Sequence, residues 1–318
     1  MTGCLVCGAP ASHCFQDKGY DFFECSDSGC GHVFVWPLPR EEELRALYTV
    51  DEASIANSDS WTMARDYVAS PEVVRDYYRK TRIRWLQENG CPLGPDTAVL
   101  DVGCSTGMFL RTLADAGLSR LHGVDLSELH CAYVRDTHGI ACDISLDLVP
   151  DDAFDLVTCY AVIEHTGDPS GLVEAMKRKL RPGGKLMILT PNYRSLYRKL
   201  AGSSWVWLIP PVHLQYFGNA SLATLLKRSG MEILVNSSDY SSTYVYLLVH
   251  HATRLLGRQV PATSRSGRPL TLAMIHGLEA VIRAALWPAA GIARMTNQHN
   301  EINVLAARPE TVSTLKCR

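Results

Sequence analysis

The sequence has no excess of charge of either sign. Lysine and arginine together number 31 and aspartate and glutamate number 33, so the formal net charge at pH 7 is −2. Proteins that bind nucleic acid through its phosphates need a basic surface. The balance of charge therefore argues against a nucleic-acid partner.

The chain also has no basic start followed by an apolar segment, so we do not expect secretion. Its 11 cysteines do not indicate a disulfide framework, because Cys142 and Cys159 fall in predicted buried strands and Cys104 falls in a glycine loop. Free thiols in such places are typical of a reducing compartment, and we expect a cytoplasmic protein. A chain of 318 residues can bury one large core and add an accessory module.

One glycine of the dinucleotide-binding fingerprint is missing as well. Residues 99–107 read VLDVGCSTG, which predicts a buried strand that ends with Asp101, a tight glycine loop, and a helix that starts near Thr106. In the fingerprint G-x-G-x-x-G, the second glycine lets the backbone approach a pyrophosphate. Ser105 occupies that position here and partly blocks the approach.

The next strand supplies an acid. Asp125 stands at the end of the strand predicted in the segment LHGVDLS, 22 residues beyond Gly103, and an acid at this spacing is suited to the hydroxyls of a ribose. A ligand with a ribose and without a pyrophosphate fits this pattern better than NAD does. Together with Gly107, the pattern resembles the first motif of the class I S-adenosylmethionine-dependent methyltransferases, D-x-G-x-G-x-G, in which the middle glycine varies.

Two later segments carry the same resemblance. Residues 153–169, AFDLVTCYAVIEHTGDP, resemble the family's fourth strand and the loop after it, and residues 172–192 resemble its helix, Pro-Gly-Gly turn and fifth strand. Apolar residues recur at helical spacing from Leu172 to Leu180, Pro182-Gly183-Gly184 is expected to break the helix, and KLMILT is a short apolar strand. The implied fold is α/β, with a seven-stranded doubly wound Rossmann-like sheet and a cofactor-binding core at residues 91–240.

The resemblance implies which residues bind S-adenosylmethionine. They are Asp101, Gly103, Cys104, Gly107, Asp125, Leu126, Asp143 and Ile144. Asp101 and Gly103 are expected near the methionine moiety, and Asp125 is expected to hold the ribose. Asp143, which ends the predicted third strand, is expected near the adenine amine, and one of the two apolar residues is expected to pack on the adenine ring.

Four cysteines near the N-terminus form two pairs, with the spacings C-x2-C and C-x4-C. The predicted metal ligands are Cys4, Cys7, Cys25 and Cys30, and the reserve ligands are His13, Cys14 and His32. Two such pairs are typical of a tetrahedral, structural Zn²⁺ site. The short β-like runs 20–24 and 32–36 fit a zinc ribbon at residues 1–40. Free thiols in a reduced protein are the alternative.

A zinc ribbon before this core resembles the zinc-ribbon methyltransferases of deoxysugar, polysaccharide and natural-product pathways, in which the ribbon helps to shape the substrate side of the cleft. The resemblance implies methyl transfer to a small acceptor, a sugar or a natural-product intermediate. Residues 41–90 are expected to link the two parts, with a polar linker or lid at 51–60 and a helical segment from Met63 to Asn89.

Four residues are candidates for catalysis, namely His165, His213, Glu164 and Tyr160. His165 follows the predicted fourth strand, and a neutral imidazole oriented by an adjacent carboxylate is suited to removing a proton from the acceptor. The alternative for the Glu-His pair is a role in packing and hydrogen bonding only. The alternative for His213 is a loop histidine that anchors backbone. Tyr160 is placed to contact either substrate.

Trp205 and Trp207 lie in the apolar loop GSSWVWLIPP. Aromatic side chains in such a loop are suited to a wall or lid of the acceptor pocket. The alternative is that both side chains simply pack.

A long insertion precedes the last strand. Residues 231–239 predict the sixth strand and residues 301–309 the seventh, so that residues 241–298 form a helical insertion and residues 299–318 the last strand and tail. The apolar stretch 270–295 contains internal charges, a proline and a glycine, which argue against a membrane-spanning helix. Three interpretations stay open for it: a cap over the acceptor pocket, an interface in a homodimer, or a helix at a membrane surface.

Two other functions remain as alternatives. One is a non-catalytic binding or scaffold protein that keeps the cofactor fold, although the intact glycine loop and its acids argue against it. The other is an RNA methyltransferase. It is less favoured because the chain has neither a basic patch nor the Asn/Asp-Pro-Pro-aromatic motif that amino-methylating enzymes carry after the fourth strand.

Overall fold

The computed structural model describes residues 2–40, 42–44, 71–239 and 296–310. The predicted linker or lid at 51–60 lies outside the described residues. Almost all of the predicted helical insertion also lies outside the described residues. It includes the stretch 270–295, whose three interpretations are a cap, a dimer interface and a membrane contact.

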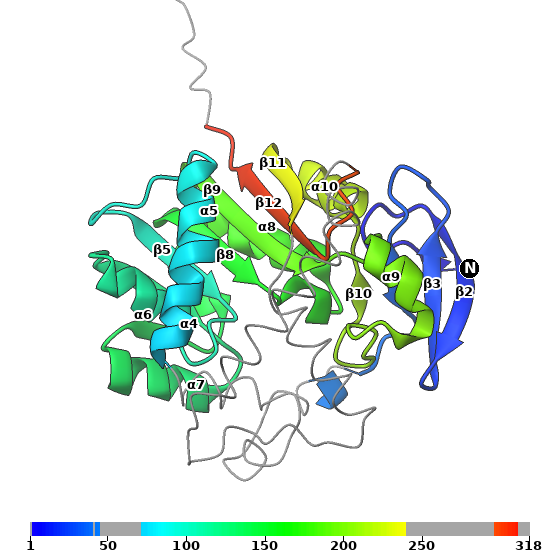
Figure 1. Ribbon diagram of the computed structural model, residues 1–318, viewed down its shortest axis with the longest axis horizontal. Coiled ribbons are helices and arrows are strands. Elements are labelled where there is room, and N and C mark those ends of the chain that lie inside the picture. Colours follow the sequence, from blue (N-terminus) through cyan, green and yellow to red (C-terminus); the bar gives the residue numbers. More distant parts are fainter. Residues whose placement is uncertain (1, 41, 45–70, 240–295, 311–318) are drawn as a thin grey trace, which may run out of the picture.

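A seven-stranded mixed sheet forms the centre of the molecule (Figure 1), with the strand order β11-β12-β9-β8-β5-β6-β7. Its strands are β5 (Ala98–Val102), β6 (Arg120–Val124), β7 (Ala141–Asp143), β8 (Phe154–Tyr160), β9 (Leu180–Pro191), β11 (Glu232–Asp239) and β12 (Glu301–Ala307). The five strands from β5 to β9 are parallel to their neighbours, and β12 runs antiparallel between β9 and β11. The predicted doubly wound α/β sheet is confirmed.

Helices cover both faces of this sheet. One face carries α4 (Pro71–Tyr78), η1 (Arg79–Ile83), α5 (Arg84–Glu88), α6 (Met108–Asp115), α7 (Glu128–Tyr133) and η2 (Val134–His138), and the other carries α8 (Pro169–Lys179) and α10 (Asn219–Arg228). Because side chains alternate along a strand, Val99 packs with α6 and its neighbour Leu100 packs in the cluster of α8. Burial on both faces explains why β5 reads as an unbroken apolar run before its acid.

Three shorter helical turns and one short helix lie in the loops. They are η3 (Leu146–Leu148), η4 (Ile163–His165), α9 (Leu196–Ala201) and η5 (Gly202–Ser204). The turn η4 directly follows the loop after β8. It carries the Glu-His pair that the sequence singles out.

The boundary between α8 and β9 differs from the prediction. The helix ends at Lys179, and Leu180 is already the first residue of β9, paired with Phe154 of β8. The next pair is Leu156 with Lys185, so five residues of β9 correspond to two of β8. The Pro-Gly-Gly turn is therefore a bulge at the start of the strand. The predicted helix start near Thr106 is also two residues early, since α6 begins at Met108.

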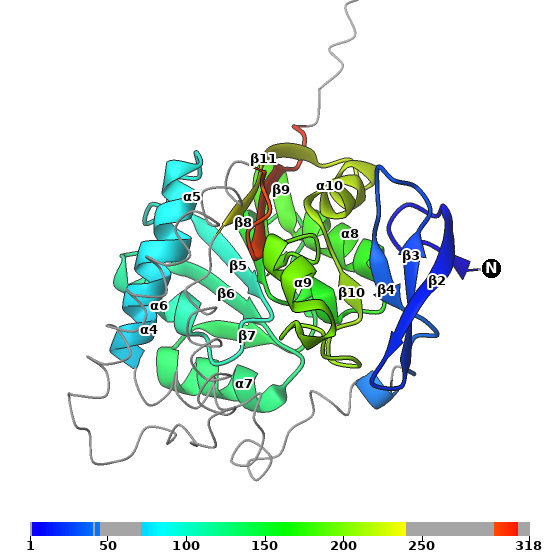
Figure 2. The same ribbon diagram turned by 45° about the vertical axis from the view of Figure 1, so that its right-hand side comes forward.

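A second, five-stranded antiparallel sheet is built mainly from the N-terminal residues. Its order is β1 (Thr2–Gly3), β2 (Pro10–Asp17), β3 (Tyr20–Cys25), β4 (Val33–Val35) and β10 (Gln215–Tyr216). The last of these strands comes from the far part of the chain, and Figure 2 shows it lying between the large sheet and the other four strands. In the antiparallel pair, Gln215 lies opposite Phe34 and Tyr216 lies opposite Val33.

Buried hydrogen bonds reinforce this junction. The ring of His32 is fully buried, and its Nε2 lies 2.9 Å from Oε1 of Gln215, whose amide nitrogen donates to the carbonyl of Thr166 at 2.9 Å. The ring of His32 packs against Phe34 and Phe217. A separate apolar cluster also joins the small sheet to the later loops, and it consists of Phe22, Val33, Val35, Tyr193, Trp205, Leu208, Leu214 and Tyr216. The small sheet is thus fixed to the loops at the edge of the large one.

Within the described residues, no helix combines the length and the hydropathy that crossing a membrane would require.

We expect Gln215→Ala to lower the free energy of unfolding by about 2–4 kcal/mol, because it leaves the Nε2 of His32 and the carbonyl of Thr166 buried without their shared partner. Chemical denaturation measures the loss. The matched control is Gln16→Ala on the exposed side of β2, which should stay within about 0.5 kcal/mol of the wild type. Equal stability of the two variants would show that the buried amide does not hold the junction.

Candidate active site

The loop after β5 folds over the end of β6. The carbonyl oxygen of Val124 accepts hydrogen bonds from the backbone N–H groups of Gly103 at 2.7 Å and Cys104 at 3.1 Å. The next N–H, that of Ser105, donates to Oδ2 of Asp125 at 2.8 Å. Three successive loop N–H groups are therefore tied to the end of the neighbouring strand, which holds the loop at the carboxyl edge of the sheet.

Glycine is required at both ends of this loop. Gly103 and Gly107 have φ angles of +73° and +70°, in the left-handed region that other residues avoid. A Cβ atom on Gly103 would lie 2.2 Å from Cγ2 of Val162, and one on Gly107 would lie 2.7 Å from Cγ2 of Val134. The first contact brings the loop directly against the residue that precedes η4.

Asp101 lies at the base of the loop and is only 4% exposed. The hydroxyl of Thr158 on β8 donates to its Oδ1 at 2.6 Å. Burial raises the pKa of Asp101 to about 7, and the nearby charge of Asp125 adds to the rise. Thr158 is a site residue that the sequence analysis did not identify, because a single hydroxyl in an apolar strand does not reveal its partner.

Asp125 follows β6 with its carboxylate held on three sides. Besides the N–H of Ser105, it accepts a hydrogen bond from the N–H of Ser127 at 3.0 Å, and its Oδ1 lies 3.1 Å from Nδ1 of His130. These contacts fix the direction of the carboxylate at the end of the strand. His130 is a second residue that the sequence analysis missed.

The other residues predicted to bind the cofactor lie at the same edge of the sheet. Leu126 is 67% exposed and Ile144 is 44% exposed, so both present apolar surface without a covering partner. Asp143 ends β7, and its carboxylate is engaged by Nε2 of His122 at 2.7 Å. Cys104 contributes only its backbone to the loop, because its buried thiol lies 3.5 Å from that of Cys142.

Glu164 in η4 is almost completely buried, with 1% exposure. The hydroxyl of Thr190 on β9 donates to its Oε2 at 2.9 Å, whereas its Oε1 has no hydrogen-bond partner within the part of the chain that the structure describes. Burial raises the pKa of Glu164 to about 8. Thr190 therefore sets the direction of this carboxyl group, and no feature of the sequence pointed to it.

His165 and His213 come together from segments 48 residues apart, with ring centroids 4.7 Å apart and an interplanar angle of 81°. The Nδ1 atom of His165 lies 2.8 Å from the carbonyl oxygen of Val212, and that of His213 lies 3.0 Å from the carbonyl of Trp207. The backbone of Ala161 also contacts the first ring. Burial lowers the pKa of both histidines, and the proximity of His165 lowers that of His213 further. Both rings are therefore neutral near pH 7.

The structure separates the other predicted aromatic residues. The ring of Trp207 stacks on His213, with centroids 5.8 Å apart, so it forms a wall of this group. Trp205 packs instead against Tyr193 in the cluster at the small sheet. Tyr160 lies on the face of the sheet covered by α6, with its ring against Phe109. Its hydroxyl is buried and has no hydrogen-bond partner in the described ranges.

The four predicted cysteine ligands lie together, with all four sulfur atoms within 4.8 Å of one another. They form two close pairs, Cys4 with Cys30 at 3.9 Å and Cys7 with Cys25 at 3.4 Å. A zinc ion 2.3 Å from four tetrahedral thiolates requires sulfur separations of about 3.8 Å, so the cluster fits Zn²⁺.

None of the three reserve ligands belongs to this cluster. His13 is paired with Asp21, Cys14 donates to the carbonyl of Phe22, and His32 is engaged by Gln215. Ionisation of the four thiols would need a cation. Burial raises the pKa of Cys25 to about 12, so packed thiols of this kind ionise together only when a metal neutralises them.

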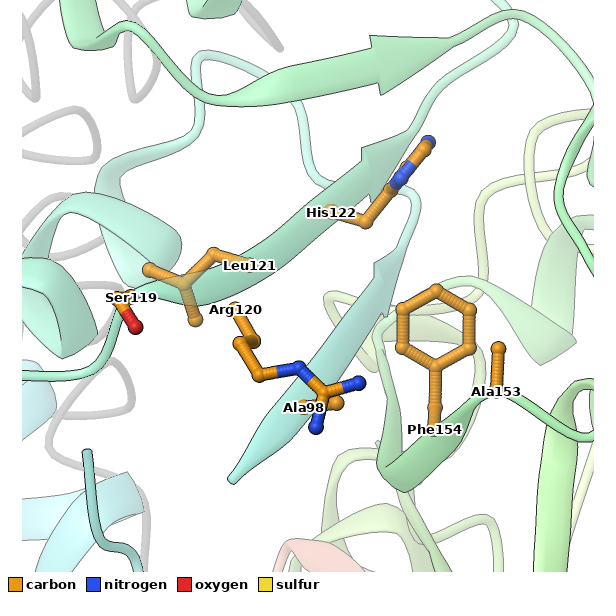
Figure 3. Close-up of a pocket in the computed structure, with 7 residues that line it drawn as sticks. All are labelled: Ala98, Ser119, Arg120, Leu121, His122, Ala153 and Phe154. Carbon is orange, nitrogen blue, oxygen red and sulfur yellow. The ribbon is translucent and has the colours of Figure 1, made fainter. Parts of the chain in front are cut away.

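An open hollow of about 300 Å³ lies at the opposite edge of the large sheet (Figure 3). It is lined by residues at the amino-terminal ends of three strands, including Ala98, Arg120 and Phe154. Ligands of open α/β sheets bind at the carboxyl ends of the strands. We therefore place the active site at the glycine loop and not at this hollow.

Residues 74–235, about half of the chain, match the model of a family described as a methyltransferase domain. A ubiquinone biosynthesis O-methyltransferase of Thiobacillus denitrificans is 30% identical over 166 residues, which cover 48% of this chain and 70% of that protein. The corresponding protein of Bordetella pertussis is 29% identical over 167 residues, covering 48% and 68%. Among solved structures, a SAM-dependent methyltransferase from Archaeoglobus fulgidus aligns with a TM-score of 0.49 and 18% identity, covering 79% of this chain and 100% of that one.

The contact between Gly103 and Val162 predicts the effect of a single methyl group. Gly103→Ala pays the cost of a left-handed alanine, about 1–2 kcal/mol, and also collides with a stiff β-branched side chain, which adds about 1–3 kcal/mol. Gly90→Ala is the matched control, because Gly90 has a φ of +77° and open space around it. Thermal unfolding should show the larger loss for Gly103→Ala, partly restored by adding Val162→Ala. Equal losses in the two alanine variants would disprove the close contact.

Proposed function

Because this chain belongs to the class I S-adenosylmethionine-dependent methyltransferases, we propose that it methylates a hydroxyl group of a small biosynthetic intermediate, a sugar or a natural product. One observation carries the proposal. The glycine loop packs on Val162, and η4 with Glu164 and His165 begins at the next residue. The cofactor loop and the buried acid–histidine group are therefore contiguous, as transfer between two bound molecules requires.

The residues at the loop fit the methyl donor. Asp125 presents a fixed carboxylate suited to ribose hydroxyls, and Leu126 and Ile144 present exposed apolar surface suited to an adenine ring. Asp101 supplies a buried acid for the positively charged methionine end. When bound, S-adenosylmethionine supplies a methyl group on a positively charged sulfur.

The acceptor side is formed by the neutral imidazoles of His165 and His213. A neutral imidazole near the acceptor takes the hydroxyl proton as the oxygen forms its new bond. The carbonyls of Val212 and Trp207 hold both rings in one tautomer, and the adjacent carboxyl of Glu164 stabilises the ring that gains a proton. Burial excludes water from the group, so that the methyl group is not lost to hydrolysis.

The acceptor class is supported by two resemblances. The curated relatives are named for an O-methylation in ubiquinone biosynthesis, which supports a hydroxyl acceptor. The arrangement of a four-cysteine cluster before the methyltransferase core supports a sugar or natural-product intermediate. We assign the cluster a structural Zn²⁺, since four thiolate ligands leave no open position for chemistry.

Replacement of either histidine tests the proposed function. With saturating S-adenosylmethionine and a panel of nucleotide-linked sugars and phenols, the wild type should release S-adenosylhomocysteine with at least one acceptor. The variant that removes the base, His165→Ala or His213→Ala, should lower that rate by about 10²–10⁴-fold. Its affinity for S-adenosylmethionine should be unchanged. His13→Ala, on the exposed β2, is the control. Near wild-type rates in both variants would exclude the proton-transfer role, and tight binding without any product would indicate a binding protein.

Donor binding should depend on pH through Asp101. Its pKa of about 7 in the free protein means that the carboxyl is mostly protonated at pH 6, and a cationic donor favours the ionised form. Affinity for S-adenosylmethionine should therefore rise about tenfold from pH 6 to pH 8, with release of a proton. Calorimetry in buffers of different ionisation enthalpy measures both. Asp101→Asn removes the titrating carboxyl and leaves the titrating groups of S-adenosylmethionine unchanged. Its affinity for S-adenosylmethionine should therefore not show this rise with pH. The same steep rise in the variant would assign the proton to another group.

A further inference from the structure

Three potential metal ligands converge beside the glycine loop, outside the cysteine cluster. One ligand atom from each of Glu164, His165 and His213 lies within 4.8 Å of the other two. Two of them are adjacent in η4, and the third enters from the segment just before β10. The large sheet and the junction with the small sheet thus bring one carboxylate and two imidazoles to one point.

The carboxyl group of Glu164 is oriented toward this point and is incompletely satisfied. Its Oε2 accepts the hydrogen bond from Thr190. Its Oε1 is buried, has no hydrogen-bond donor among the described residues and lies 4.0 Å from Nε2 of His165. A buried carboxylate oxygen without a partner is costly. A cation between Oε1 and the two rings would remove that cost.

Both histidines have the hydrogen bonds that metal-binding histidines usually have. A carbonyl oxygen can only accept, so the contacts to Val212 and Trp207 require a proton on Nδ1 of each ring. The lone pair of each neutral imidazole is then on Nε2. A ring nitrogen that donates to a backbone carbonyl while the other binds the ion is the common outer arrangement of a metal site.

From this geometry we propose that Glu164, His165 and His213 bind a divalent transition-metal ion of the Zn²⁺ class. Bonds of about 2.0–2.2 Å in a tetrahedral arrangement place neighbouring ligand atoms roughly 3.4 Å apart, so ligand atoms that lie up to 4.8 Å apart here would move closer by up to roughly 1.4 Å when the ion binds. Two imidazoles and one carboxylate favour a transition metal over Mg²⁺. Three protein ligands leave a position open, unlike the four thiolates of the ribbon.

The consequence for catalysis rests on the proposed function. An ion at this point would lower the pKa of an acceptor hydroxyl bound to it. The hydroxyl proton would then leave to solvent, and the two histidines would serve as ligands instead of as the base. The cation site itself stands on the geometry alone, so binding and turnover can be tested separately.

Cobalt substitution of the full-length protein tests the site, since the two clusters differ in donor atoms. The metal-free protein should take up two equivalents of Co²⁺. One should show the intense sulfur-to-cobalt charge-transfer absorption of thiolate ligands, and the other should show only the weak bands of nitrogen and oxygen ligands. Glu164→Gln, which keeps an oxygen for Thr190, and His213→Gln should each weaken the second equivalent by roughly 100-fold or more and leave the first unchanged. His13→Gln is the control and should bind both.

Several outcomes would overturn the proposal. The first is a wild type that binds a single Co²⁺, held by thiolates. The second is that both variants still bind the second Co²⁺ as tightly as the wild type does, and the third is that excess Mg²⁺ displaces this second Co²⁺. Unchanged thermal unfolding of Glu164→Gln shows that the fold is kept, and the wild-type stoichiometry is decisive without any variant. Release of S-adenosylhomocysteine is measured in parallel. If the protein binds one Co²⁺ and still forms product, the metal site is disproved and the methyltransferase function stands. If it binds two Co²⁺ and forms no product with any acceptor, the metal site stands and the proposed function is disproved.

Discussion

The peptide groups around Leu214 are the constraint on which the rest of the site depends. The N–H of this residue donates to the carbonyl of Glu164 at 2.8 Å, and its own carbonyl accepts from the N–H of Val35 at 2.9 Å. One buried residue of the loop is therefore bonded to η4 on one side and to β4 of the small sheet on the other. The position of His213, the preceding residue, follows from both bonds. The small sheet that carries the cysteine cluster is thus hydrogen-bonded to the loop that carries His213.

The site is also organised around positive charge. Burial without a counter-ion raises the pKa of Asp101 to about 7 and that of Glu164 to about 8, so each carboxyl is poised to ionise when a cation approaches. Asp101 lies at the base of the glycine loop that packs on Val162, and Glu164 follows Val162 by two residues in η4. In a chain with almost no net charge, the readiness of these two carboxyls to ionise beside a cation comes from local burial and not from a charged surface.

The large sheet and the cofactor edge could be predicted from the sequence because β5 is an apolar run that leads into the glycine loop, and because an acid, Asp125 or Asp143, stands at the end of each of the next two strands. The boundary at Leu180 was wrong because helical spacing continues to that residue, whereas pairing with Phe154 decides its conformation. Strand β10 has two residues, too few for any periodicity. Thr158 and Thr190 were missed since a buried hydroxyl in an apolar strand gives no sign of which carboxyl it meets.

The antiparallel pairing of Val33 with Tyr216 also constrains the order of folding. These residues are 216 − 33 = 183 positions apart, whereas the hairpins within the small sheet join neighbours in the chain. Contacts between distant residues form late, because the intervening chain has to be ordered first. The small sheet is thus completed only after β10 has been synthesised and ordered. Until β10 arrives, its edge strand β4 is open to pairing with another molecule.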